Sequence, residues 1–170
     1  MLPERHVAES RMLKVGDRAP DFSNPDADMN IVELPQFRGR TLVLYFYVRD
    51  DTPGCTTEAI EFSELEDDFA KQGATVLGVS RDDCIRHGEF RDKHGISVRL
   101  LADKEQATSM AYGVLQDKEV DGVMRKSVVR STFIIDKQGV IRHALYGVSS
   151  RGHAAEVLQL VALMSKGELK

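Results

Sequence analysis

The 170-residue sequence is poor in cysteine and proline, has no tryptophan and contains no long apolar run. It has only two cysteines, with no C-x-x-C motif and no cluster of Cys and His at ligand spacing, which argues against a zinc site. Its N-terminus lacks the apolar segment of a secretory signal, and no run reaches the roughly 18 residues of a membrane span. We therefore expect a cytoplasmic protein whose cysteines serve chemistry rather than structural crosslinking.

The charge balance excludes a further class. The formal net charge is −4 and no long basic run is present, so a nucleic-acid surface is not expected. Hydrophobic residues make up 42% and charged residues 29%, which is ordinary globular composition. We predict a flexible N-terminal arm over residues 1–12 and a single domain over residues 13–170. No metal or other cofactor is predicted.

The most informative stretch runs from Thr41 to Ala59 and reads TLVLYFYVRDDTPGCTTEA. Thr41–Tyr47 is apolar, β-branched or aromatic, as in a strand buried on both faces. Thr52 and Pro53 then suit the N-cap and first position of a helix. Cys55 would lie in the first turn of that helix, beyond the carboxyl end of a core strand. Free amides and the helix dipole favour a thiolate there.

The remaining pattern predicts an α/β fold. The helix that holds Cys55 should end at Gly73, and a second buried strand, Ala74–Val79, should complete a βαβ unit with parallel strands. The other predicted elements are strands at 31–34, 98–101, 129–136 and 140–146, helices at 85–94, 106–112 and 152–165, and a long loop at 115–127. This order suggests a thioredoxin-like fold, with a central mixed β-sheet flanked by helices.

Three classes of function remain open at this point. Thioredoxins have C-x-x-C where this chain reads Thr52-Pro53-Gly54-Cys55, so a hydroxyl replaces the first thiol. That difference argues against dithiol–disulfide exchange within the motif. The alternatives are a thiol peroxidase and a thioredoxin-fold binding or holdase protein in which Cys55 has no chemical role.

The sequence resembles the peroxiredoxins, most closely the bacterioferritin-comigratory protein (PrxQ) subfamily. The resemblance extends from about Lys14 to Leu163 and includes VGDRAPDF, DDTPGCTTEA, VSRDD, LLADKE and RSTFIIDKQGVI. It implies a thiol-dependent peroxidase that reduces hydrogen peroxide and organic hydroperoxides through a sulfenic acid on Cys55, in antioxidant defence. It also implies that Thr52 and Arg130 complete the peroxide site.

Further residues receive roles in this interpretation. Arg130 begins a strand predicted to be antiparallel to the Cys55 strand, so it should reach the same sheet edge and stabilise the thiolate. Pro53 and Gly54 should line the peroxide site, with the amides of Gly54 and Cys55 as donors. We expect Glu58 to turn away from the thiolate and support the helix start or an arginine such as Arg49.

Two features depart from the family pattern. Val48 stands where the family usually has a proline that shields the thiolate, which puts the tightness of the pocket in question. The usual positions of a resolving cysteine are Ile60 and Arg91 here, so Cys84 is the only thiol that could resolve Cys55. The alternative is a one-cysteine cycle with an external thiol.

The expected partners of the protein follow from this peroxidase cycle. Thioredoxin, glutaredoxin or a low-molecular-weight thiol would be the reductant, and the protein would be a monomer or weak dimer without nucleic-acid or membrane partners. The four histidines that follow Cys55 lie at no spacing that suggests a base, so we expect surface or structural roles for His87, His94, His143 and His153.

Overall fold

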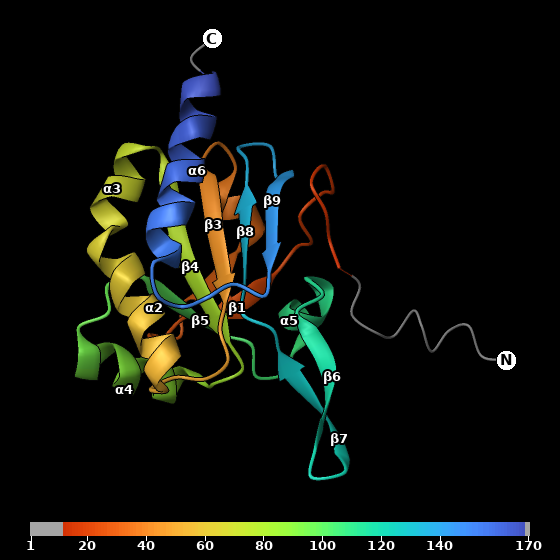
Figure 1. Ribbon diagram of the computed structural model, residues 1–170. Coiled ribbons are helices and arrows are strands. Elements are labelled where there is room, and N and C mark those ends of the chain that lie inside the picture. The colour runs from red at the N-terminus through yellow and green to blue at the C-terminus, as the bar shows by residue number, and fades with distance from the viewer. Residues whose placement is uncertain (1–11, 169–170) are drawn as a thin grey trace, which may run out of the picture.

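The computed structural model describes residues 12–168 (Figure 1). The arm predicted over residues 1–12 lies outside the described residues, apart from Met12. The elements are, in chain order, β1 (Ser23–Pro25), β2 (Ile31–Glu33), η1 (Leu34–Phe37), β3 (Thr41–Phe46), α2 (Pro53–Glu64), α3 (Glu66–Lys71), β4 (Ala74–Ser80), α4 (Cys84–His94), β5 (Arg99–Ala102), α5 (Ala107–Ala111), β6 (Leu115–Val120), β7 (Val123–Val128), β8 (Ser131–Ile135), β9 (Ile141–Tyr146) and α6 (His153–Glu168). Within residues 12–168, no helix combines the length and apolar character needed to cross a membrane.

A five-stranded mixed sheet forms the centre of the molecule, with strand order β5-β4-β3-β8-β9. β3, β4 and β5 run parallel, whereas β8 is antiparallel to β3 and β9 is antiparallel to β8. The predicted βαβ unit is therefore present, with β3 and β4 as its strands. The central mixed sheet flanked by helices agrees with the predicted α/β class.

β3 is the middle strand, and every one of its residues is buried. Its side chains alternate between two cores, as the period of a strand requires. Leu42, Leu44 and Phe46 pack against the N-terminal segment and α5 on one face. Val43 and Tyr45 pack on the other face against α2, α3 and α6, which lie together over the sheet in Figure 1. The continuous apolar run in the sequence reflects this burial on both faces.

The register of the sheet brings three chain segments to one edge. Phe46, the last residue of β3, pairs with Ser131, the first residue of β8. The amide of Tyr47 donates to the carbonyl of Val79 near the end of β4. The loop before α2, the turn after β4 and Arg130 therefore meet at the carboxyl edge of the parallel strands, as predicted.

The prediction of a long loop at 115–127 is wrong. These residues form the β6–β7 hairpin, which extends away from the body of the molecule in Figure 1. Its turn is Asp121-Gly122, and both residues have positive φ, 52° and 78°. Asp-Gly favours this kind of tight hairpin turn. Because most of both strands is exposed, the sequence shows no alternation of apolar and polar residues, and the hairpin was missed.

The predicted helix from Pro53 to Gly73 is interrupted. Leu65 departs from helical geometry, with φ −99° and ψ 4°, and separates α2 from α3. Gly73, whose backbone has the left-handed conformation, ends this pair of helices, as predicted. The short strand β1, which pairs with β2, was also not predicted, because it has three residues and ends in proline.

Candidate active site

Cys55 is the third residue of α2 and lies in its first turn. The residue is almost fully buried, with 1% of its surface exposed, and it packs in the core beneath α2 and α6. Its Sγ atom accepts a hydrogen bond from Nη2 of Arg130 at 3.3 Å. A permanent cation thus contacts the sulfur atom directly, so Arg130 reaches Cys55 from the sheet edge where it was predicted to lie.

Glu58 binds the same guanidinium. Its Oε1 accepts from Nη1 of Arg130 at 2.6 Å, and the carboxyl group is fully buried. The expectation that Glu58 would support an arginine is correct, but the suggested partner, Arg49, is wrong. Cys55 and Glu58 lie one helical turn apart, so both reach Arg130, the residue immediately before β8. Glu58 thereby fixes the orientation of the guanidinium that contacts the thiol.

Two acidic groups therefore share one cation in a buried site. Burial raises the pKa of Glu58 to about 7, although the charge of Arg130 and its hydrogen bond act in the opposite direction. Burial alone would lower the pKa of Arg130, but the charges of Glu58 and Cys55 raise it overall. Oε2 of Glu58 is buried and has no hydrogen-bond partner among the described residues. The site therefore favours a proton on Glu58 up to neutral pH.

Thr52 occupies the predicted N-cap position, but its hydroxyl does not cap the helix. The hydroxyl donates to the carbonyl oxygen of Arg49 at 2.8 Å, and no helix amide donates to it. The backbone carbonyl of Thr52 accepts from the amide of Thr56 instead. Because its hydrogen is already used, the hydroxyl can offer only its oxygen to a ligand.

Gly54 permits the close approach of the arginine. A Cβ atom at this position would lie 3.2 Å from Nη2 of Arg130 and 3.4 Å from Oγ of Ser150. Ser150, in the segment between β9 and α6, therefore lies beside the site. No sequence signal marks Ser150 as a site residue, because only the packing of that segment onto α2 brings it near Cys55.

Val48 does not open the site. The side chain is 39% exposed, yet Cys55 retains only 1% exposure. Arg130 is also largely covered, with 17% of its side chain exposed. The shielding that the usual proline would provide is therefore supplied by other parts of the structure.

Cys84 is the first residue of α4, directly after the N-cap Asp83. It lines a cavity of about 620 Å³ together with residues of β1 and α5, and Cys55 is not among the lining residues. Burial raises the pKa of the Cys84 thiol, and the charges of Asp83 and Asp26 raise it further. These surroundings disfavour a thiolate on Cys84, in contrast to the cationic contact at Cys55.

Comparisons with known proteins agree with this geometry. Residues 15–144 match the model of the AhpC/TSA family. Peroxiredoxin Bcp of Bacillus subtilis is 38% identical over 154 residues, which cover 91% of this chain and 98% of that protein. Peroxiredoxin Bcp of Xanthomonas campestris is 39% identical over 128 residues, which cover 75% of this chain and 80% of that protein.

The chain is a peroxiredoxin of the AhpC/TSA family. Solved structures support the same conclusion. Peroxiredoxin Q of Xanthomonas campestris superposes with a TM-score of 0.82 at 35% identity, over 85% of this chain and 91% of that one. A cysteine-to-serine variant of PrxQ from Xylella fastidiosa gives a TM-score of 0.85 at 34% identity, over 92% and 99% of the two chains. The predicted thioredoxin-like fold and the resemblance to the PrxQ subfamily are confirmed.

Membership in this family also confirms the predicted activity at a general level. Peroxiredoxins are thiol-dependent peroxidases, so this protein is an oxidoreductase that reduces peroxides with a cysteine thiol.

Proposed function

We propose that this peroxiredoxin reduces hydrogen peroxide and organic hydroperoxides with Cys55 as the attacking residue. The observation that carries the proposal is the bridge formed by Arg130, which donates to Cys55 through Nη2 and to Glu58 through Nη1. A guanidinium fixed in this way can stabilise both the thiolate and the charge that moves onto the peroxide oxygens. Organic substrates are included because a similar protein, the Xanthomonas campestris bacterioferritin comigratory protein, has an alkyl peroxide reduction activity.

The first step is a nucleophilic displacement at oxygen. An electron pair of the Cys55 thiolate forms the S–O bond while the O–O bond breaks. The distant oxygen leaves as hydroxide or alkoxide and takes up a proton to give water or an alcohol. Sulfur loses two electrons and becomes a sulfenic acid, which is the first stage of cysteine oxidation.

The start of α2 supplies the remaining contacts. The amides of Gly54 and Cys55 lie in the first turn, where helix geometry leaves amides without an intrahelical acceptor, so they can donate to the bound peroxide. Pro53 occupies the first helical position, where its missing amide costs nothing, and helps to line the site. The oxygen of Thr52 can accept the peroxide proton, because its own hydrogen is donated to Arg49.

The sulfenic acid is then reduced by an external thiol. This thiol attacks the sulfur of Cys55 and expels hydroxide, which leaves as water after protonation, and a mixed disulfide forms. A second thiol releases Cys55 and leaves with the first as a disulfide. Thioredoxin, glutaredoxin or a low-molecular-weight thiol is the proposed reductant, and the cytoplasm is the proposed location because these thiols are kept reduced there.

A resolving role for Cys84 is the second candidate. Its position favours it in one respect, because the start of α4 lies next to the loop that leads into α2. The raised pKa of its thiol and its location in a separate cavity argue against it. We therefore give preference to the one-cysteine cycle. In either cycle we expect a monomer or a weak dimer.

Intact mass measurements test both points. The reduced wild type and the Cys84→Ser variant are each treated with one equivalent of hydrogen peroxide, and Cys55→Ser serves as the control. A gain of one oxygen atom in both proteins supports the one-cysteine cycle. A loss of two hydrogens in the wild type, with a gain of oxygen in the variant, makes Cys84 the resolving residue. If neither protein changes, the role of Cys55 is refuted.

A further inference from the structure

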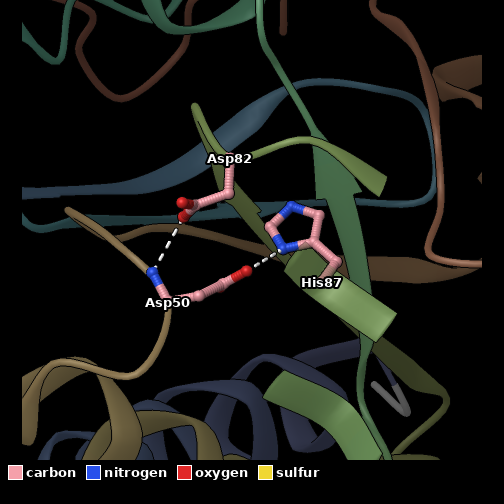
Figure 2. Close-up of side chains that lie close together, drawn as sticks. All are labelled: Asp50, Asp82 and His87. Atoms are coloured by element: carbon pink, nitrogen blue, oxygen red, sulfur yellow. Dashed lines mark hydrogen bonds and ion pairs between the residues drawn. The ribbon is translucent and has the colours of Figure 1, made fainter. Parts of the chain in front are cut away.

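A second cluster of polar residues lies outside the Cys55 site (Figure 2). It joins Asp50, in the loop between β3 and α2, to His87 on α4. Nδ1 of His87 lies 2.6 Å from Oδ2 of Asp50, and both side chains are at most 1% exposed. The hydroxyl of Tyr47 donates to the other oxygen of Asp50 at 2.5 Å. The backbone amide of Asp50 donates to Asp82 at 2.8 Å.

The partners of His87 define where its protons are. Nε2 lies 2.9 Å from the carbonyl oxygen of Leu101, which can only accept a hydrogen bond, so Nε2 must carry a proton. Nδ1 faces a carboxylate oxygen, and one more proton is held between these two atoms. Asp50 and His87 therefore form a buried pair with a shared proton, and neither ring nitrogen has a free lone pair. A metal ion at this cluster would have to displace these hydrogen bonds.

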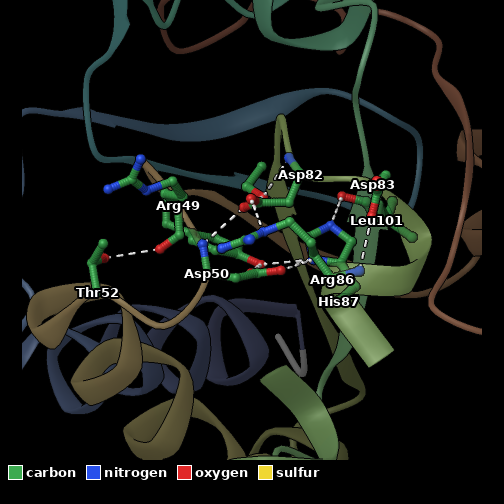
Figure 3. A network of polar contacts seen from close by, with 10 residues as sticks. Arg49, Asp50, Thr52, Asp82, Asp83, Arg86, His87 and Leu101 are labelled. Carbon is green, nitrogen blue, oxygen red and sulfur yellow. Dashed lines mark hydrogen bonds and ion pairs between the residues drawn. The ribbon is translucent and has the colours of Figure 1, made fainter. Parts of the chain in front are cut away.

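Figure 3 shows Asp50 and His87 within a wider polar network that includes Asp82 and Arg86. The next residue in the loop, Asp51, contacts the same helix, α4. Asp51 accepts from Nζ of Lys93 and contacts Nε2 of His94, both at 2.8 Å, in the last turn of α4. Asp51 also has a positive φ of 63°, which is uncommon for a residue other than glycine. The loop before α2 is thus attached to α4 at a buried point, Asp50, and at an exposed point, Asp51.

Cys55 cannot complete its catalytic cycle in the closed structure. With 1% of the residue exposed, its sulfur is not accessible to an attacking thiol, which must approach opposite the S–O bond. The start of α2 must therefore open after the peroxide step. Asp50 precedes Cys55 by five residues, so displacement of this segment pulls directly on the pair with His87.

We propose that Asp50 and His87 are positioning residues that form a latch between the active-site loop and α4, and that this latch sets the balance between the closed and open forms of the Cys55 site. This inference rests on the proposed role of Cys55. The closed form suits attack on the peroxide, because Arg130 then contacts the sulfur. The open form suits reduction by an external thiol. Breaking the latch should affect the two half-reactions in opposite directions.

The test uses proteins in the Cys84→Ser background, so that Cys55 is the only thiol. Asp50→Ala, His87→Ala and the double variant are compared with their parent in three measurements. These are alkylation of reduced Cys55 by iodoacetamide, oxidation by hydrogen peroxide, and reduction of the sulfenic acid by dithiothreitol. We expect alkylation and reduction to become about tenfold faster and peroxide oxidation to become about tenfold slower. The double variant should resemble the single variants, because one contact is lost in all three.

Two further variants separate a latch from general loosening. Asp50→Asn keeps a hydrogen bond to Tyr47 and can donate to Nδ1 of a neutral His87. Its three rates should therefore be closer to those of the parent than the rates of Asp50→Ala are. Arg91→Ala is the matched control on α4, because Arg91 pairs with Asp28 and Asp92 and not with the loop. The proposal is overturned if the folded alanine variants change all three rates in the same direction or have the same rates as the control. It is also overturned if the effect of the double variant on each rate equals the product of the effects of the two single variants.

Hydrogen exchange of the wild type tests the latch without any substitution. The amide of Thr56 donates to Thr52 in the first turn of α2, and the amide of His87 donates to Asp83 in the first turn of α4. Opening of the α2 start breaks the first of these bonds but not the second, which lies within α4, so Thr56 should exchange faster than His87 through a local opening. Equal protection of both amides would contradict a separate opening of the α2 start. Alkylation and exchange do not depend on peroxidase activity, so failure of the latch and failure of the proposed function give different results.

Discussion

Replacing Glu58 with glutamine should change how the stability of this peroxiredoxin depends on pH. In the folded protein, burial raises the pKa of Glu58 to about 7, compared with 4.5 for an unperturbed glutamate. Between these values the folded state keeps a proton that the unfolded chain has released. The free energy of unfolding of the wild type therefore falls as the pH rises through this range. Below pH 4.5 both states are protonated, and the destabilising contribution is absent.

The size of the effect follows from the two pKa values. Their difference corresponds to on the order of 3 kcal/mol, because one pKa unit is equivalent to about 1.4 kcal/mol. The full effect of burial applies to this carboxyl group, because no part of the Glu58 side chain reaches solvent. A glutamine stays neutral throughout, and its oxygen can still accept from Nη1 of Arg130. The free energy of unfolding of Glu58→Gln should therefore rise relative to that of the wild type as the pH increases. The difference should reach about 3 kcal/mol between about pH 4.5 and about pH 8.

Urea unfolding of the reduced proteins at several pH values measures this difference. Glu64→Gln is the matched control, because Glu64 lies on the same helix and is exposed. Its free energy of unfolding should follow that of the wild type at a constant offset. A change of less than about 1 kcal/mol between Glu58→Gln and the wild type across this range would refute the conclusion that Glu58 titrates near neutral pH.

Three further predictions concern the packing around the site. Gly54→Ala should slow oxidation of Cys55 by peroxide about 10- to 100-fold in stopped-flow measurements, because the new methyl group would displace the guanidinium 3.2 Å away; an unchanged rate would contradict this. Arg130→Lys should reduce kcat/KM at least about 100-fold, since one ammonium group cannot bridge Cys55 and Glu58 as the guanidinium does, and a near-normal value would count against the bridge. Gly78→Ala should lower the free energy of unfolding by about 1–3 kcal/mol, because its Cβ would lie 2.7 Å from Cζ of Tyr45; Gly88→Ala, which has no such contact, is the control.

The sequence was sufficient to predict the features that depend on local patterns. Thr41–Tyr47 is apolar, β-branched or aromatic throughout, as the burial of β3 on both faces requires, and Thr52-Pro53 marks the start of α2. These two signals placed Cys55 in a first turn at the end of a core strand. The prediction that Arg130 reaches the same edge also held, because antiparallel pairing of two adjacent strands fixes which of their ends meet.

Local signals were weaker where a segment is exposed or an element is short. The β6–β7 hairpin has polar residues on both faces, so no periodic pattern distinguished it from a loop. The Asp121-Gly122 pair is the one local signal of this hairpin, because both residues have the positive φ of a tight turn. The break at Leu65 has no glycine or proline to mark it, and β1 is only three residues long.

The partners of each charged group were decided only by the tertiary structure. The sequence places Glu58 one turn after Cys55, but whether it binds Arg49 or Arg130 depends on which arginine the sheet brings over α2. Asp50 and His87 are separated by 37 residues and meet because α4 packs beside the loop at the end of β3. Local sequence fixes where each residue lies along its own element. The contacts between elements, and the pKa values that depend on burial, exist only once the sheet and helices have packed together.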